Sequence, residues 1–203
     1  MDKFTAFAAT AAPYLKPNVD TDLIIRVERC ARTPRAELGR YAFEMVRFLP
    51  DGADNPEFVL NQAPFRGAQI LLGGENFGCG SSREMAVWAI AGLGMRCVIA
   101  PSFGEIFFGN CLQNGLLPVR LSRDVVERMG GAMLVDPSRG VLTVDLARQK
   151  VVWGDEEFAF EIDMLKKRML LEGLDEIGMT LARGEEIAAF QQQDRARRPW
   201  IYV

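Results

Sequence analysis

The sequence predicts an α/β fold built on a mixed sheet, and two patterns carry this prediction. Short apolar runs at 68–72, 97–100 and 117–121 alternate with helix-like runs. This order indicates parallel strands joined by right-handed crossovers. From residue 141 onward apolar and polar residues alternate instead, around the turn residues Gly154-Asp155. That second pattern is typical of antiparallel strands joined by a hairpin.

The elements follow in a simple order along the chain. A strand at 4–11 leads to a turn at Pro13, and the arginine-rich segment 26–40 has little periodicity, so we expect an exposed loop there. Segment 50–64 is polar and rich in turn residues, which predicts a second surface loop. Helices are predicted at 41–49, 84–91, 102–113, 123–129, 165–171 and 185–193, and strands at 68–72, 97–100, 117–121, 141–146 and 150–162.

Length and composition fit one domain over 1–203, with a core at about 1–130 and antiparallel strands and a helical extension at about 131–203. Apolar residues make up 49 % of the chain and charged residues 25 %, as in ordinary globular proteins. The net charge of −3 and the lack of a long basic run argue against a nucleic-acid partner. No apolar run is long enough for a membrane span, and the first residues lack a signal pattern. We therefore expect a cytoplasmic protein without a membrane partner.

The residues available for chemistry are restricted, because the chain contains no histidine. Its four cysteines, at 30, 79, 97 and 111, have no CxxC spacing, so no metal site is predicted on this chain. Cys79 lies in a Gly-rich turn, where we expect a small buried thiol rather than a nucleophile. Any acid–base chemistry must therefore use other side chains, or a base or metal from another chain.

The segment Glu75-Asn-Phe-Gly-Cys-Gly-Ser-Ser-Arg-Glu84 is the main candidate site. It joins a predicted strand to a predicted helix. Its glycines let the backbone approach a ligand, and the first N–H groups of a helix attract an anion. Arg83 adds a planar fork of donors suited to carboxylate or phosphate. This combination predicts a binding site for a small, multiply charged acid.

Ser81 has a structural alternative, because Ser81 and Glu84 have the spacing of a capping box. Arg83 in a first helical turn would oppose the helix dipole, which favours a ligand-facing role, and Ser82 could cap while Ser81 faces the ligand. The turn lacks the third glycine of a dinucleotide fingerprint, and the chain has no P-loop. Lowering a serine pKa by about five costs about 7 kcal/mol. A helix N-terminus provides at most about 2 kcal/mol. Ser81 could therefore act as a base only with a further positive centre.

Two other segments carry candidate polar groups. Asp20-Thr-Asp22 could cap the next segment, or Asp22 could orient a partner's histidine or a substrate hydroxyl. The arginines after residue 25 are either solvated side chains or, for one or two of them, groups that close over an anion.

Several ordered motifs resemble the family of 3-isopropylmalate dehydratase (isopropylmalate isomerase) small subunits, within the aconitase superfamily. They are the segment 75–84, Gly173-Leu-Asp-Glu-Ile-Gly-Met-Thr-Leu181, Asn18-Val-Asp-Thr-Asp-Leu-Ile-Ile25, Val98-Ile-Ala-Pro-Ser-Phe103, Ile106-Phe-Phe-Gly-Asn110 and Leu116-Leu-Pro-Val119. The resemblance implies a swivelling β/β/α domain like the last domain of aconitase. It also implies a large dehydratase subunit, in a heterodimer or heterotetramer, that carries a [4Fe–4S] cluster and the catalytic histidines.

The resemblance further implies dehydration of 2-isopropylmalate and rehydration to 3-isopropylmalate in leucine biosynthesis. By position, Ser81 would remove the proton α to a carboxylate, and Asp22 would be an acid near the base of the site. Gly80, Ser82 and Arg83 would hold the carboxylate as charge builds. The cluster iron would take the leaving hydroxyl.

Two departures from the family pattern keep other functions open. Met85-Ala-Val87 stands where the family has His-Ala-Pro, and Arg26-Val-Glu-Arg-Cys30 replaces an apolar loop that touches the substrate. Arg26 and Arg29 would suit a polar 2-hydroxy di- or tricarboxylate, so a paralogous hydro-lyase subunit is one alternative. A non-catalytic, anion-binding regulatory module is the other.

Overall fold

Buried apolar strands build the parallel half of the sheet. In the computed structural model, which describes residues 1–202, the strands β1 (Phe7–Tyr14), β2 (Ile70–Gly73), β3 (Cys97–Ala100) and β4 (Leu117–Arg120) are all parallel. β2 and β3 are wholly buried. Strands that read as continuous apolar runs are typical of a parallel sheet covered on both faces.

Three alternating strands extend the same sheet on the other side of β1. β5 (Val141–Asp145) pairs antiparallel with β1, β6 (Lys150–Trp153) with β5, and β7 (Glu156–Ala159) with β6. The result is one seven-stranded mixed sheet of order β4-β3-β2-β1-β5-β6-β7. The predicted fold class and hairpin are confirmed.

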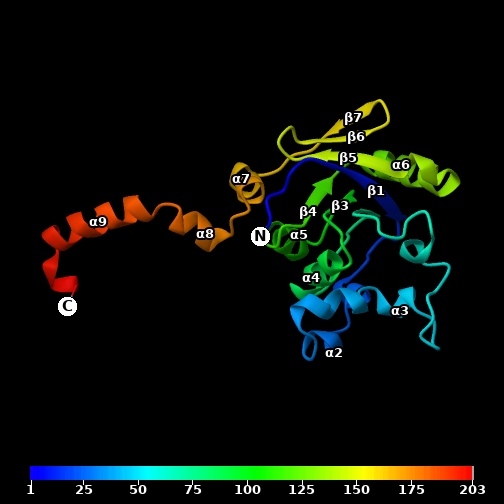
Figure 1. Cartoon of the computed structure of the whole chain (residues 1–203), viewed down its shortest axis with the longest axis horizontal. Helices are drawn as coiled ribbons and strands as arrows, with labels where there is room; N and C mark the ends of the chain where they lie inside the picture. Colours follow the sequence, from blue (N-terminus) through cyan, green and yellow to red (C-terminus); the bar gives the residue numbers. More distant parts are fainter. Residues whose placement is uncertain (203) are drawn as a thin grey trace.

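Helices cover both faces of the sheet (Figure 1). α6 (Arg123–Val135) packs against β1, β2 and β3, whereas α4 (Met85–Gly92) and α5 (Glu105–Gln113) lie on the opposite side. The short helix α1 (Thr21–Ile24) packs against α4. This packing brings the segment after β1 to the segment after β2.

Segment 26–40 is mostly exposed, as expected, but the expectation of a loop was wrong, because two short helical segments form there. They are α2 (Val27–Cys30) and the 3-10 helix η1 (Arg35–Tyr41), and α3 (Glu44–Arg47) follows. Leu38 is 1 % exposed, and a Cβ atom added to Gly39 would overlap the backbone of Gly92. Close packing of η1 on α4 orders this segment, and local periodicity does not reveal such a contact. The 3-10 turn η2 (Val59–Asn61) lies in the second predicted loop.

The C-terminal part leaves the sheet after the 3-10 turn η3 (Pro137–Gly140) and strands β5–β7. α7 (Met164–Glu172) stays on the body, where Phe4 N donates to Leu170 O at 2.8 Å. α8 (Glu176–Leu181), α9 (Gly184–Arg197) and the 3-10 turn η4 (Pro199–Ile201) extend away from the sheet (Figure 1). None of the helices in residues 1–202 has the length and apolar character of a membrane span.

Candidate functional site

The carboxyl ends of the parallel strands carry the candidate site. The segments after β1, β2 and β3 continue the strand pairing through two isolated parallel bridges, Asp20 with Cys79 and Phe77 with Phe103. Open α/β sheets bind ligands at this edge. The predicted Gly-rich turn therefore lies between the Asp20-Thr-Asp22 segment and the start of α5.

Backbone hydrogen bonds fix the turn in this position. Gly78 N donates to Val19 O at 2.7 Å, and Thr21 N donates to Cys79 O at 2.9 Å. On the other side, Gly104 N donates to Phe77 O at 2.9 Å. Because every one of these bonds joins segments far apart in sequence, the turn is held by the fold rather than by its own residues.

The two glycines of the turn are needed for different reasons. Both have left-handed backbone angles, φ +72° at Gly78 and +94° at Gly80. A Cβ atom at Gly78 would also overlap the ring of Phe107, whereas one at Gly80 would meet only ordinary contacts with Asp20 and Thr21. Gly78 is therefore a packing requirement, and Gly80 keeps the backbone open beside Ser81.

Ser81 bonds to a neighbouring segment and does not cap the helix. Its Oγ lies 2.9 Å from Thr21 Oγ1, and its backbone N–H donates to the same oxygen at 3.2 Å. α4 begins only at Met85, and Glu84 accepts a hydrogen bond from Asn114 Nδ2 at 2.7 Å. Within residues 1–202 neither Ser81 nor Ser82 makes a capping bond, so the capping alternatives are wrong.

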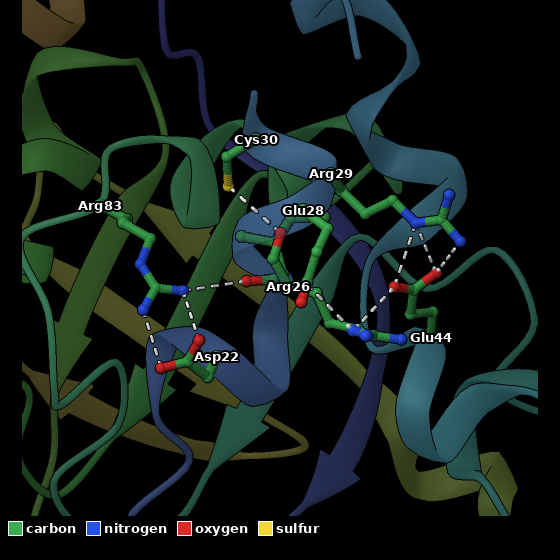
Figure 2. Close-up of polar contacts among 8 residues, drawn as sticks. Asp22, Arg26, Glu28, Arg29, Cys30, Glu44 and Arg83 are labelled. Atoms are coloured by element: carbon green, nitrogen blue, oxygen red, sulfur yellow. Dashed lines mark hydrogen bonds and ion pairs between the residues drawn. The ribbon is translucent and has the colours of Figure 1, made fainter. Parts of the chain in front are cut away.

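Arg83 and Asp22 form a two-point ion pair that joins the turn to α1. Arg83 Nη1 lies 2.6 Å from Asp22 Oδ1 and Nη2 lies 2.8 Å from Oδ2, and Nη1 also donates to Ile25 O at 3.3 Å (Figure 2). The hydrogen bond from Arg83 lowers the pKa of Asp22 below its ordinary value and raises that of Arg83. Both side chains are thus charged at neutral pH.

One edge of the Arg83 fork remains available. The pair with Asp22 uses Nη1 and Nη2 end-on, and among the described residues Nε makes no hydrogen bond. A guanidinium carries five donors and can bind a second carboxylate through the edge formed by Nε and Nη2. Arg83 is largely buried but its side chain is still 19 % exposed, so this edge is not sealed inside the fold.

Arg26 and Arg29 converge on one carboxylate. Arg29 Nε donates to Glu44 Oε2 at 2.9 Å, and its guanidinium lies 4.1 Å from the Tyr41 ring centroid. Arg26 Nε lies 3.3 Å from Glu28 and 3.8 Å from Glu44. Figure 2 shows both arginines pointing toward Glu44, on the side away from Arg83. The sequence reasoning missed Glu44, because nothing in its local pattern marks it as a partner.

The turn borders a cavity of about 270 Å³ lined by 78–81 and 104–107. Gly80 and Ser82 are exposed and Ser81 is half-buried, so a small acid can reach them. Burial, with a smaller contribution from Asp20, raises the pKa of the Cys79 thiol. Cys79 therefore stays protonated at neutral pH, as a poor nucleophile.

The residues described here do not fit a metal cluster. Within 1–202 no group of three or more cysteine, aspartate or glutamate side chains is placed to hold a metal ion. Cys97 and Cys111 are fully buried in the core. Iron–sulfur clusters need several cysteine ligands in one place, and this arrangement does not provide them.

Comparisons with known proteins agree with the fold and show the family. The family model of the aconitase C-terminal domain matches residues 1–124, and a model of the C-terminal domain of the 3-isopropylmalate dehydratase small subunit matches residues 176–202. The 3-isopropylmalate dehydratase small subunit of Gluconacetobacter diazotrophicus is 50 % identical, covering 98 % of this chain and 97 % of the relative. That of Paramagnetospirillum magneticum is 47 % identical, covering 99 % and 100 %.

A solved structure supports the same assignment. The crystal structure of 3-isopropylmalate dehydratase from Methanocaldococcus jannaschii has a TM-score of 0.65 and 25 % identity, and the match covers 92 % of this chain and 99 % of that one. The chain therefore belongs to the family of 3-isopropylmalate dehydratase small subunits, whose core is an aconitase C-terminal domain.

Proposed function

We propose that this chain is the small-subunit half of an active centre that isomerises 2-isopropylmalate to 3-isopropylmalate in leucine biosynthesis, by dehydration and rehydration. The observation that carries the proposal is the placement of Ser81 and Arg83. Both lie in one turn, whose residues Gly80 and Ser82 are exposed to solvent. A hydroxyl and a guanidinium so arranged suit a substrate that has a carboxylate next to an acidic C–H bond.

Ser81 is proposed as the group that takes the proton α to a carboxylate. Ser81 is half-buried and borders the cavity, so it can reach a bound acid while staying partly shielded from water. Removal of this proton spreads negative charge onto the adjacent carboxylate. The free edge of Arg83, with the backbone N–H groups of the exposed residues Gly80 and Ser82, would hold that carboxylate as charge develops.

Asp22 is proposed as a positioning group for Arg83. A carboxylate on the end-on face of the fork fixes the plane of the guanidinium, which leaves the Nε edge at a set angle to the site. Because Asp22 carries a negative charge, it also keeps the empty site close to neutral. A substrate carboxylate then meets a guanidinium that is already oriented.

The remaining parts of the reaction need a second chain. This chain has no histidine, and the described residues do not fit a metal cluster. Its relatives are named as small subunits, which implies a large one. We propose that the large dehydratase subunit carries the cluster and binds the substrate on the side opposite the Ser81 turn.

The C-terminal arm, defined as residues 174–202, is proposed as a contact with that large subunit. It carries apolar side chains that the body does not cover, among them Ile177, Leu181, Phe190 and Trp200. Exposed apolar groups in such number mark interaction surfaces. A family model specific to dehydratase small subunits matches 176–202, whereas the model named after aconitase ends at residue 124. From residue 176 onward the arm thus lies outside the match to the aconitase domain and inside the match to the model of dehydratase small subunits.

The charges around Arg29 bear on the choice of substrate. Arg26 and Arg29 replace apolar residues of the family, and this replacement suggested a more polar substrate. Glu44 and Glu28 compensate both arginines, and Tyr41 covers Arg29. The charges of Arg26, Arg29, Glu28 and Glu44 sum to zero, so these residues add no net positive charge for an additional carboxylate, which favours 2-isopropylmalate over a more polar 2-hydroxy acid.

The experiment that tests the function is reconstitution. The purified chain alone should not turn over 2-isopropylmalate, and the chain mixed with a cluster-loaded large subunit should do so. Citramalate and homocitrate, assayed beside it, should be poorer substrates. Turnover by the lone chain, or a clear preference for homocitrate, would contradict the proposal.

A further inference from the structure

Thr21 is a buried polar residue that touches the candidate base. It is 1 % exposed and is the first residue of α1. Its backbone is held on both sides, because Thr21 N donates to Cys79 O at 2.9 Å and Thr21 O accepts from Ile25 N at 3.0 Å. Its side chain is stiff as well, since a β-branched residue has few rotamers. The Thr21 hydroxyl is therefore fixed in place.

The contacts of this hydroxyl give its hydrogen bonds a direction. Ser81 N–H can only donate, so Thr21 Oγ1 accepts at 3.2 Å. The second contact, Thr21 Oγ1 to Ser81 Oγ at 2.9 Å, can run either way by geometry alone. Among residues 1–202, however, Ser81 Oγ is the one acceptor within reach of the Thr21 proton. Buried hydroxyls use their proton, so Thr21 donates and Ser81 Oγ accepts.

We propose that Thr21 is a positioning residue that donates its hydroxyl proton to Ser81 Oγ and so stabilises Ser81 as the base; this rests on the proposed function of Ser81. A hydrogen bond donated to an oxygen strengthens as that oxygen becomes negative. The same bond turns the Ser81 proton away from Thr21, toward the open side of the turn. Thr21 thus sets both the charge that Ser81 Oγ can carry and the direction in which it reacts.

The Ser81 amide reinforces this effect through Thr21. Ser81 N–H polarises the Thr21 hydroxyl, which in turn donates to Ser81 Oγ. Bonds in such a chain strengthen one another, the more so where water is partly excluded. Through Thr21, the dipole of the Ser81 peptide group therefore acts on the Ser81 side chain.

No neighbouring charge of this chain replaces the Thr21 donor. Arg83 is paired with Asp22, and Asp20 accepts from Leu23 N at 2.7 Å. The Cys79 thiol, with its raised pKa, is neutral at pH 7, and the exposed Glu105 lines the same cavity. The ionisable groups packed around Ser81 thus provide carboxylates and one guanidinium, which pairs with Asp22 on one face and is assigned to the substrate carboxylate on the other. A neutral donor is what can stabilise negative charge on Ser81 Oγ.

The test uses the chain reconstituted with its large subunit and two matched pairs of variants. Wild type and Thr21→Val have nearly the same shape but differ in the hydroxyl, and Thr21→Ser and Thr21→Ala differ by one oxygen atom. A hydrogen bond to a charged group contributes enough to change a rate about tenfold to a hundredfold. We expect kcat to fall by that factor in Thr21→Val and Thr21→Ala, with KM unchanged, and to stay within about threefold of wild type in Thr21→Ser.

A pH profile separates this role from a purely structural one. In Thr21→Ala the rising limb of kcat should move to higher pH than in Thr21→Ser, because the base is harder to deprotonate. If Thr21→Val does not assemble with the large subunit, the serine and alanine pair decides. Equal kcat and pH profiles in that pair, or a loss confined to KM, would overturn the proposal. Ser81→Ala sets the floor: if that variant is active, the base assignment itself is wrong, whatever Thr21 does.

Discussion

Arg83 joins Asp22 through two nearly parallel hydrogen bonds, 2.6 Å from Nη1 to Oδ1 and 2.8 Å from Nη2 to Oδ2. The pair links the turn after β2 to the first turn of α1, so the two segments that hold the candidate site share one electrostatic contact. It also divides the guanidinium into an occupied face and a free one. Both consequences can be measured.

The pKa of Asp22 should report this pair directly. Because Arg83 lowers the pKa of Asp22, the pair stabilises the folded state above the ordinary aspartate pKa, and this stabilisation is lost as the pH falls through the lowered value. A carbonyl-detected NMR titration of the lone chain should place the Asp22 midpoint below the ordinary range. Arg83→Gln should move it back up. An unchanged midpoint in that variant would show that the pair does not form in solution.

Replacing Arg83 by lysine should be severe although the charge is kept. A lysine ammonium cannot hold Asp22 and a second carboxylate in one plane, so we expect kcat/KM of the reconstituted enzyme to fall at least about tenfold. Arg40→Lys is the matched control, since the Arg40 side chain is 76 % exposed on the surface. A similarly small effect in both variants would show that Arg83 does not bind the substrate.

The turn should tolerate no side chain at Gly78. Gly78→Ala combines a left-handed backbone with overlap of the Phe107 ring, whereas Gly52→Ala has φ +87° but no atom within 4 Å of the added Cβ. The control should lose about 1 kcal/mol of unfolding free energy from the backbone term alone. Gly78→Ala should lose about 1–3 kcal/mol more from overpacking. Equal losses in urea unfolding would mean that the ring moves aside freely.

The C-terminal arm should matter for assembly and not for folding. Phe190 is 62 % exposed on α9, so Phe190→Ser should leave the melting temperature of the lone chain within about 2 °C. The same change should weaken binding to the large subunit about tenfold or more in a titration, since a buried aromatic anchor contributes over 1 kcal/mol. Val135→Ser on α6, also highly exposed, is the control. If both variants bind as wild type does, the arm is not the contact.

Sequence alone predicted the parts of the fold in which local pattern and tertiary packing agree. β3 was predicted at its observed bounds, 97–100, because a buried parallel strand is a continuous apolar run. The predicted turn at Pro13 was wrong, and Pro13 lies within β1. β5 pairs only with Phe7–Thr10, so the missing N–H of Pro13 need not break a ladder bond there.

The residue types of the candidate site were predictable from the sequence, but the contacts between them were not. Residue types in the turn indicated an anion site, and in the structure Ser81 and Arg83 of the turn bond to Thr21 and Asp22 of α1. The contacts of Thr21 with Ser81 and of Glu44 with Arg29 depend on how distant segments pack, which no local spacing encodes. The capping prediction failed for the same reason, because Asn114 holds the Glu84 side chain.

The most direct test of the central claim is the activity of Ser81→Ala after reconstitution with a cluster-loaded large subunit. The variant should assemble with the same affinity as wild type, because the Ser81 backbone N–H still bonds to Thr21 Oγ1. Its kcat for 2-isopropylmalate should fall to background while substrate still binds. Near-normal kcat in the assembled variant would contradict the account.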